Sequence, residues 1–172
     1  MKNKIIKKIF IIGTSGTGKT YLSKKLSKLY NIEKIDLDEI EWKSKYSERR
    51  NPQEKTKLIK NILEKNKWII EGAYTHWTEE IAKKADIILW LKFNTSLLKR
   101  RLIVRYIKNK IANKKPKLKE LKNLIKFVEN YNKYKEKNEA YKNHQELVNK
   151  NKKNLIIVGN KKELNILLKK LK

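Results

Sequence analysis

The chain has 172 residues, of which 39% are apolar and 37% charged, and it contains no cysteine. This length fits one compact domain with its own hydrophobic core. Without cysteine the chain cannot form a disulfide scaffold, a zinc ribbon or a thiol nucleophile, and His76 and His144 are too few for a histidine-built metal site. We therefore expect any metal ion to be bound by oxygen ligands.

The net charge is +27, from 45 Lys and Arg against 18 Asp and Glu. A charge of this size attracts polyanions, so a nucleic-acid partner has to be considered. Forty of the cations are Lys, in a chain also rich in Ile and Asn, and a compositional bias of this kind raises the charge without any partner. No apolar stretch approaches the ~20 residues of a membrane span, and the run at Ile9–Ile12 is too short for a signal peptide. We expect a cytoplasmic protein with no membrane partner.

Short apolar runs alternate with helical patterns along the chain, which is typical of βαβ units and a parallel sheet. The predicted strands are Lys8–Ile12, Lys34–Leu37, Trp68–Glu71, Ile87–Leu91 and Leu155–Val158. The predicted helices are Lys19–Tyr30, Pro52–Asn66, Thr78–Lys84, Thr95–Asn113, Leu118–Lys150 and Lys161–Leu171. We interpret residues 1–172 as a single α/β domain.

The region between Tyr106 and Asn154 is rich in Lys, with fifteen Lys and five Glu. Apolar residues recur in it at helical spacing, so at least its first half is expected to pack an apolar face; they are Leu118, Leu121, Leu124, Ile125, Val128 and Tyr131. The pattern favours one or two amphipathic helices that cover the sheet or a cleft, as a lid would. A dedicated nucleic-acid arm is the alternative.

The segment Gly13–Thr20 reads Gly-Thr-Ser-Gly-Thr-Gly-Lys-Thr and matches G-x-x-x-x-G-K-[ST] between a predicted strand and a predicted helix. The glycines let backbone N–H groups surround a phosphate, and the helix directs its positive end at the same charge. The motif predicts that Lys19 reaches the β- and γ-phosphates of ATP and that the Thr20 hydroxyl ligates Mg²⁺. The predicted nucleotide-binding residues here are Gly13, Thr14, Ser15, Gly16, Thr17, Gly18, Lys19, Thr20 and Tyr21.

Three carboxylates follow the second and third predicted strands, at the edge where parallel α/β sheets bind ligands. Asp36 and Asp38 lie at the end of one strand, and Glu71 ends the next. Carboxylates beside a phosphate loop hold Mg²⁺ or accept a proton from an attacking hydroxyl. We take all three as catalytic candidates and Asp38 and Glu71, with Thr20, as metal candidates; turn chemistry or helix capping is the alternative. Asp86 opens a strand at the opposite edge and is expected to be structural.

Three of the five Arg in this Lys-rich chain fall within residues 100–105. Arg101 and Arg105 share a helical face at i, i+4 spacing, with Arg100 beside them. Because guanidinium groups bind phosphate oxygens in a bidentate manner, we expect Arg101 and Arg105 to stabilise the transferred phosphoryl group and Arg100 to contact the nucleotide. A cluster on a solvated basic helix is the alternative.

Aromatic and cationic residues follow the same strand ends. They are candidate walls of an acceptor pocket or simply part of the core: Trp42, Tyr46, Arg49, Arg50, Tyr74, His76 and Trp77. The last strand leads into Gly159-Asn160-Lys161, which imitates the guanine-reading segment of small GTPases. Glu163 stands where that segment has Asp, and no D-x-x-G motif follows the phosphate loop. We expect Asn160 to line the nucleotide site, next to adenine.

Together these motifs make the chain resemble the adenylate-kinase-like P-loop kinases, and within them the bacterial and archaeal topology modulation family. The resemblance rests on the phosphate loop, on L-D-x-x-x-W from Leu37 to Trp42, and on Trp68–Tyr74, which is similar to that family's W-I-I-D-G-N-Y. Glu71 and Ala73 depart from the last pattern. The resemblance implies a three-layer P-loop NTPase fold, with five parallel strands ordered 2-3-1-4-5 and a helical lid.

It also implies an enzyme that uses ATP and Mg²⁺ to phosphorylate a small acceptor, with a nucleoside or nucleotide favoured. A nucleic-acid-binding P-loop ATPase or regulator is the alternative from another class. A polynucleotide 5′-kinase would reconcile the two. A steep salt dependence separates polyanion binding from small-acceptor activity, and so does the distribution of the cations, clustered or even.

Overall fold

A computed structural model describes residues 6–44 and 48–171. Its main sheet has five parallel strands in the order β2-β5-β1-β6-β7. The strands are β1 (Lys8–Ile12), β2 (Lys34–Asp36), β5 (Trp68–Gly72), β6 (Ile87–Leu91) and β7 (Leu155–Val158). This confirms the predicted order 2-3-1-4-5, with the strand that precedes the phosphate loop at the centre.

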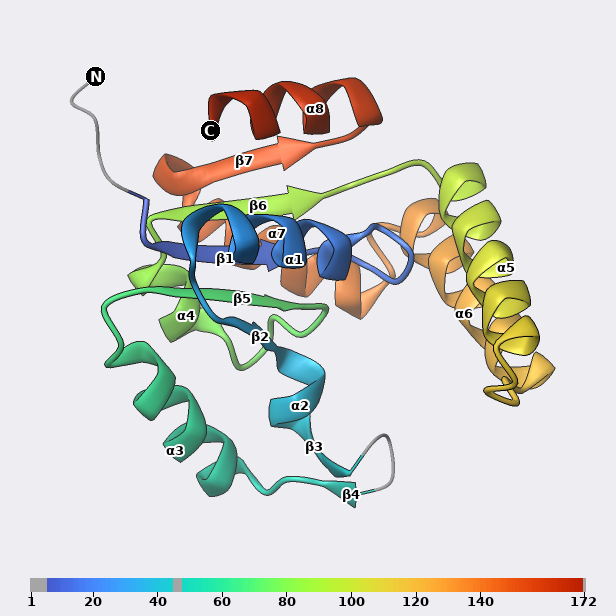
Figure 1. The fold of residues 1–172 in the computed structure, drawn as a ribbon, viewed down its shortest axis with the longest axis horizontal. Coiled ribbons are helices and arrows are strands. Elements are labelled where there is room, and N and C mark those ends of the chain that lie inside the picture. The colour runs from blue at the N-terminus through green and yellow to red at the C-terminus, as the bar shows by residue number, and fades with distance from the viewer. Residues whose placement is uncertain (1–5, 45–47, 172) are drawn as a thin grey trace.

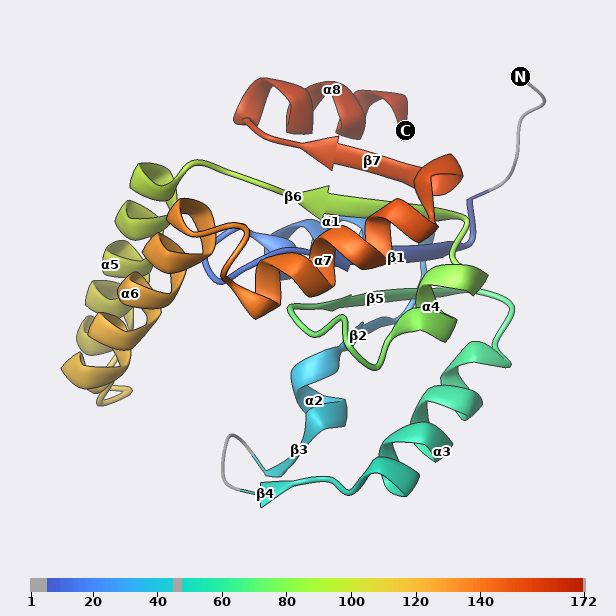
Figure 2. The ribbon, with the colours of Figure 1, turned by 180° about the vertical axis from the view of Figure 1, so that it is seen from behind.

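Helices cover both faces of the sheet, as Figures 1 and 2 show from opposite sides. α1 lies across one face, and α4 and α7 lie across the other. Apart from a short helix directly after β2, which is described below, the helices are α1 (Lys19–Tyr30), α3 (Pro52–Leu63), α4 (Glu79–Lys84), α5 (Thr95–Ile111), α6 (Leu118–Lys133), α7 (Glu139–Lys150) and α8 (Lys161–Lys170). A 3₁₀ turn lies at Lys152–Asn154. The fold is the predicted three-layer α/β arrangement.

The central strand supplies both hydrophobic cores because its side chains alternate between the two faces. Ile9 and Ile11 pack with α1 and α8, whereas Phe10 and Ile12 pack with residues of α3, α4 and α7. All four are fully buried. This burial fixes the register of β1 and therefore the direction in which the chain leaves it at Gly13.

The segment after β2 differs from the prediction. The strand ends at Asp36, and a short helix, α2 (Leu37–Glu41), begins because the Asp36 carboxylate accepts a hydrogen bond from the Asp38 N–H at 3.0 Å. A small antiparallel hairpin of β3 (Trp42–Ser44) and β4 (Glu48–Arg49) follows, which the sequence pattern did not indicate. The short helix and the hairpin form one wall of the site described below.

The predicted helix Leu118–Lys150 is two helices. α6 stops at Lys133, and α7 restarts where the Asn138 side chain accepts a hydrogen bond from the Tyr141 N–H at 3.0 Å. α5 and α6 form an antiparallel hairpin beyond the carboxyl edge of the sheet (Figures 1 and 2). The apolar face of α6 is buried only near its end, since Leu118 is 52% exposed and Val128 is fully buried.

Smaller differences concern helix ends. α3 stops at Leu63, three residues before the predicted end, because residues 64–67 make the turn into β5. Asp86 has the expected structural position, and its carboxylate accepts hydrogen bonds from the N–H groups of Lys7 and Lys8 at 3.0 and 2.9 Å. Over the described ranges, no helix is long and apolar enough to cross a membrane.

Candidate functional site

The loop after β1 depends on glycine at three positions. Gly13, Gly16 and Gly18 have φ values of 150°, 81° and 93°, in the region that L side chains rarely adopt. A Cβ on Gly13 would lie 2.7 Å from the Leu91 carbonyl oxygen, and one on Gly16 would lie 3.2 Å from that of Leu98. The loop therefore keeps this path only with glycine, which explains the spacing of the motif.

The loop opens α1 without a side-chain cap. Gly18 occupies the N-cap position, where α3, α5, α7 and α8 each have an asparagine whose side chain accepts a hydrogen bond from the first turn, while α4 and α6 also lack a side-chain cap. The Thr14 carbonyl oxygen stabilises the curved path of the loop, since it accepts hydrogen bonds from the Thr17 hydroxyl at 2.8 Å and from the Lys19 ammonium at 3.2 Å. Uncapped first-turn N–H groups of this kind suit an anionic ligand such as a phosphate.

Lys19 lies among the three carboxylates that the sequence predicted beside it. Burial lowers the pKa of Lys19 below its usual value, and the negative charges of Glu71, Asp38 and Asp36 oppose that shift. These groups come from the ends of two neighbouring strands and from α2, which parallel pairing brings to one edge. The tertiary structure thus gathers the predicted lysine and carboxylates into one constellation.

Glu71 has a buried carboxylate, with the residue only 1% exposed. The carboxylate lies near Thr20, and its Oε1 atom has no hydrogen-bond partner within the described residues. Burial raises the pKa of Glu71, and the neighbouring Thr20 side chain lowers it. An unpartnered buried carboxylate oxygen beside a threonine hydroxyl is a suitable place for a hard cation.

The residues fit Mg²⁺ held largely by phosphate and water. In the part of the chain that the structure describes, no three His, Cys, Asp or Glu side chains form a cluster that could hold a metal by themselves. Mg²⁺ in nucleotide sites commonly takes one or two protein oxygens and completes its shell with phosphates and waters. Thr20 with Glu71 or Asp38 offers donors of that kind.

Arg101 is anchored to the phosphate loop. Its Nη1 donates hydrogen bonds to the carbonyl oxygens of Thr17 at 2.9 Å and of Gly16 at 3.3 Å, and its guanidinium lies 4.6 Å from the centre of the Phe93 ring. A cavity of about 420 Å³ opens next to it, lined by Gly16, Thr17, Gly18, Tyr21, Arg101, Leu102, Arg105, Lys161, Leu164, Asn165 and Leu168. This cavity combines the phosphate loop, two of the predicted arginines and one face of α8.

The α8 residues that line this cavity were not identified from the sequence. The signal that could have found them is that α8 starts directly after the end of a strand. Asn160 does not line the cavity. Its side chain caps α8 by accepting from the Glu163 N–H at 2.9 Å, while the Glu163 carboxylate accepts from the Gly159 N–H at 2.7 Å. Arg100 is exposed on α5 and lines a further hollow, which shares Arg101 and Arg105 with this cavity. The predicted roles of Asn160 and Arg100 toward the nucleotide stay predictions.

A second cavity, of about 530 Å³, lies on the other side of the carboxylates. It is lined by Asp36, Asp38, Glu39, Trp42, Lys43, Ser44 and Arg50. The Nε atom of Arg50 is buried and has no hydrogen-bond partner among the described residues. Carboxylates, cations and one indole therefore line the same hollow. Tyr46, which the sequence predicted as a wall residue, lies outside the described residues.

Tyr74 joins the walls of this second cavity. Its hydroxyl accepts a hydrogen bond from the Trp42 indole N–H at 3.1 Å and lies near the Asp38 carboxylate. Its ring stacks on Trp77, with centroids 5.8 Å apart. Burial and the nearby Asp38 carboxylate raise the pKa of Tyr74 to about 12. His76, in contrast, is exposed and lines a different hollow.

The buried carboxylate of Glu41 connects the two indoles through a lysine and an arginine, which makes a closed ring of contacts. Glu41, which is 3% exposed, binds the Lys55 ammonium at 3.0 Å and the Arg49 Nε at 3.6 Å. Lys55 lies 5.2 Å from the Trp77 ring, and the Arg49 guanidinium lies 5.1 Å from the Trp42 ring. Since Tyr74 contacts both indoles, six side chains from α2, β3, β4, α3 and the loop after β5 hold one another in place.

A family model described as an AAA domain matches residues 9–120, which include the phosphate loop, the carboxylates and the arginine helix. The chain belongs to this family. Like many members of large families it is recognised by the nucleotide-binding elements, and the match ends within the region of α5 and α6. Membership confirms the P-loop assignment made from Gly13–Thr20.

Solved structures place this AAA domain chain among P-loop kinase folds. A shikimate kinase from Bacteroides thetaiotaomicron is 18% identical, with a TM-score of 0.56 over 96% of each chain. A shikimate kinase from Aquifex aeolicus is 17% identical, with a TM-score of 0.52 over 94% of each chain. At these identities the likeness concerns the fold. It confirms the predicted P-loop kinase fold, and the narrower resemblance to the topology modulation family stays a prediction.

A curated relative is similar over a shorter stretch. The uncharacterized protein YqaC of Bacillus subtilis strain 168 is 34% identical over 86 residues. The match covers 49% of this chain and 48% of that protein, so it spans about half the length of each.

Proposed function

We propose that residues 1–172 form a single-domain kinase that uses ATP and Mg²⁺ to phosphorylate a hydroxyl group of a small acceptor. The observation that carries the proposal is that Lys19 directly follows residues that line one cavity and lies near carboxylates that line another. Gly16, Thr17 and Gly18 line the first, and Asp36 and Asp38, whose charges act on Lys19, line the second. A donor site and an acceptor site that share one lysine are what direct phosphoryl transfer needs.

The phosphate loop, Gly13–Thr20 with Tyr21, would hold ATP, and the first cavity would take its base. When bound, ATP supplies the phosphoryl group and Mg²⁺ neutralises part of its charge. Lys19, Arg101 and Arg105 would stabilise the negative charge on the transferred group. Thr20 and Glu71 suit the metal best, because one oxygen of Glu71 is buried, unpartnered within the described residues, and next to the threonine.

Asp38 is the best candidate for accepting the proton of the acceptor hydroxyl. It lines the second cavity, whereas Asp36 uses its carboxylate to cap α2 and Glu71 is buried against Thr20. The Tyr74 hydroxyl lies near the Asp38 carboxylate and can donate a hydrogen bond to it. A general base must be placed within hydrogen-bond reach of the proton that it takes, so a carboxylate at the cavity wall is favourable.

The acceptor is proposed to be a nucleoside or nucleotide, as the resemblance to adenylate-kinase-like enzymes implies. Trp42 offers an aromatic face to a planar group, and Arg50 and Lys43 offer cations to an anionic group. The proposed location is the cytoplasm, where ATP is supplied.

The test is ATP consumption with Mg²⁺ against a panel of nucleosides, nucleoside monophosphates and short DNA or RNA 5′-ends. Lys19→Ala serves as the blank, and Asp38→Asn tests the base while it keeps the shape of the side chain. Phosphate transferred to one small acceptor, lost in both variants, would support the kinase. ATP hydrolysis stimulated by nucleic acid, with no phosphate on any acceptor, would contradict it.

A further inference from the structure

The positive charge of the chain is concentrated on the helical hairpin of α5 and α6. Residues 99–133, here called the lysine hairpin, carry thirteen Lys and Arg and two Glu, a net charge of +11. Residues 6–44 and 48–98, which are more than twice as many, carry eighteen cations and twelve carboxylates, a net charge of +6, and residues 134–171 carry ten cations and four carboxylates, also +6. A compositional bias raises charge evenly along a chain, so it does not account for this difference.

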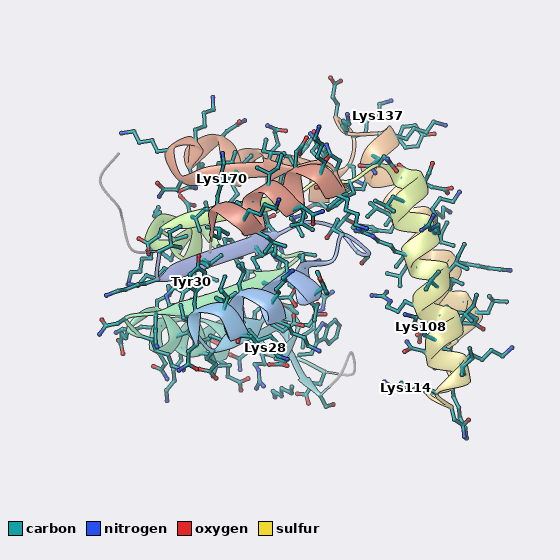
Figure 3. The ribbon with its side chains drawn as sticks, turned by 45° about the horizontal axis from the view of Figure 1, so that its top comes forward. Lys28, Tyr30, Lys108, Lys114, Lys137 and Lys170 are labelled. Carbon is teal, nitrogen blue, oxygen red and sulfur yellow. The ribbon has the colours of Figure 1, made fainter. Side chains whose placement is uncertain are left out.

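Few of these cations are neutralised by the chain itself. Eleven of the thirteen are exposed. Among the residues that the structure describes, the hairpin cation with a carboxylate partner is Lys99, whose ammonium lies 2.6 Å from Glu129. Figure 3 shows Lys108 and Lys114 on the hairpin, away from the sheet. Concentrated cations without carboxylates repel one another and create a potential that an anionic partner relieves.

The spacing of the charges suits a nucleic acid backbone. At 1.5 Å per residue, the 17 residues of α5 extend about 25 Å. The eleven exposed cations over this length give one for about every 2 Å, counted over all sides of the hairpin. One strand in the stacked B-form arrangement carries one negative charge about every 3.4 Å. The charge density of the hairpin is therefore sufficient to neutralise one such strand.

Exposed aromatic rings lie among these lysines on α6. Phe127 is 37% exposed and Tyr134, which ends the helix, is 46% exposed. Each follows a lysine in the sequence, and the Lys133 ammonium lies 5.0 Å from the centre of the Tyr134 ring. The spacing of seven residues puts both rings on nearly the same side of the helix. Aromatic rings beside lysines are the elements on which single-stranded bases stack.

We propose that the lysine hairpin is a binding surface for single-stranded nucleic acid, with its lysines on the phosphates and Phe127 and Tyr134 against the bases. This function is additional to the proposed kinase activity and does not require ATP. An anionic membrane is a poorer fit. The exposed Ile103 and Ile107 of α5 share their helical face with Arg100, whereas interfacial membrane helices separate the apolar face from the charged one.

The experiment compares two triple variants of the full chain that lose the same charge. The hairpin variant is Lys119→Gln, Lys122→Gln, Lys126→Gln, on exposed positions of α6. The matched control is Lys24→Gln, Lys28→Gln, Lys57→Gln, on exposed positions of α1 and α3. Binding of a short fluorescein-labelled single-stranded RNA is measured by anisotropy over a series of KCl concentrations without ATP, and circular dichroism verifies that both variants are folded.

We expect the hairpin variant to bind RNA about tenfold more weakly and its salt slope to fall by about 2, since each lost phosphate contact lowers the slope by about 0.7 for a single strand. The control is expected to change affinity by less than about twofold. Tyr134→Ala is expected to weaken RNA binding about fivefold and to leave binding of inorganic polyphosphate unchanged, because polyphosphate has no base that could stack on the ring.

Equal weakening of RNA binding in the two triple variants would overturn the proposal, because the affinity for RNA would then depend on the total charge of the protein and not on the hairpin. So would polyphosphate that binds as tightly as RNA at equal phosphate concentration and is as sensitive to Tyr134→Ala. Hairpin-dependent binding to phosphatidylserine vesicles, in the absence of RNA binding, would assign the surface to membranes instead. None of these outcomes bears on the kinase, because the assays contain no ATP.

Discussion

The hydroxyl group of Tyr74 accepts a hydrogen bond from the indole N–H of Trp42 at 3.1 Å, across 32 residues of sequence. The two residues belong to the two patterns on which the family resemblance rested, L-D-x-x-x-W and W-I-I-E-G-A-Y. The same hydroxyl lies near the Asp38 carboxylate, which acts on its pKa. These patterns therefore meet at one carboxylate, where the tyrosine hydroxyl is placed to donate to the proposed base.

Replacing Tyr74 with Phe removes only this hydroxyl and keeps the stacking on Trp77. In the acceptor assay we expect the turnover number to fall about tenfold and the KM for ATP to stay unchanged, because a hydrogen bond to a charged group contributes roughly 1.5–3 kcal/mol. Tyr30→Phe is the matched control. Its hydroxyl donates to the Leu171 carbonyl oxygen far from the carboxylates, so the turnover number should not change. Equal losses in the two variants would contradict the role of Tyr74.

Gly72 packs directly against the start of α2. A Cβ at this position would lie 2.6 Å from the Cβ of Leu37 and 2.7 Å from its Cδ1. We expect Gly72→Ala to lower the free energy of unfolding by about 1–3 kcal/mol, the usual effect of overpacking, and to displace the adjacent Asp38. Urea denaturation measures the change. Gly159→Ala is the control, since its nearest contact would be 3.5 Å, an ordinary van der Waals distance, and it should change stability by less than about 1 kcal/mol.

The guanidinium of Arg101 bridges two carbonyl oxygens of the phosphate loop. Lysine keeps the charge but lacks the planar guanidinium that stacks on Phe93 while its Nη1 reaches both carbonyl oxygens, so we expect Arg101→Lys to weaken ATP binding about tenfold, nearly as much as Arg101→Met. Titration with a fluorescent ATP analogue measures both. If the lysine variant binds like the wild type, charge alone is sufficient and the bridge has no role in binding.

His144 is buried behind the site, where its Nδ1 lies 3.0 Å from the Tyr131 hydroxyl and its ring stacks on Trp90. Burial, assisted by the positive charge of Lys19, lowers its pKa to about 4. At a pH below 6.5, the pKa of the unfolded chain, His144 binds a proton in the unfolded chain but not in the folded one. The free energy of unfolding therefore falls as the pH drops from 6.5 to 4. The loss contributed by His144 should approach about 3 kcal/mol.

The check is urea denaturation of the wild type and of His144→Phe across this pH range. The difference between the two free energies of unfolding should shift in favour of the variant as the pH falls. The subtraction removes the opposite contributions of Asp36 and Glu71, whose raised pKa values stabilise the folded state at low pH. A difference that does not depend on pH would show that His144 titrates normally.

Local sequence determined the phosphate loop and the elements around it. The glycines of Gly13–Thr20 are required by the backbone path itself, and the alternation of apolar runs with helical patterns defined the strands. The strand order came from the resemblance. Each of these signals lies within a few consecutive residues, where backbone conformation and burial act directly on residue type.

Only the tertiary structure decided how the acceptor side is built. The α2 helix, the β3-β4 hairpin and the ring of contacts around Glu41 combine segments that are distant in sequence, and each contact is weak until the others form. The position of α8 beside the phosphate loop and the interruption between α6 and α7 at Tyr134 likewise depend on contacts between segments that are distant in sequence. The sequence already marked the lysine-rich region by its charge, whereas the fold decided that this region projects beyond the sheet as a helical hairpin, because α5 and α6 pack on each other.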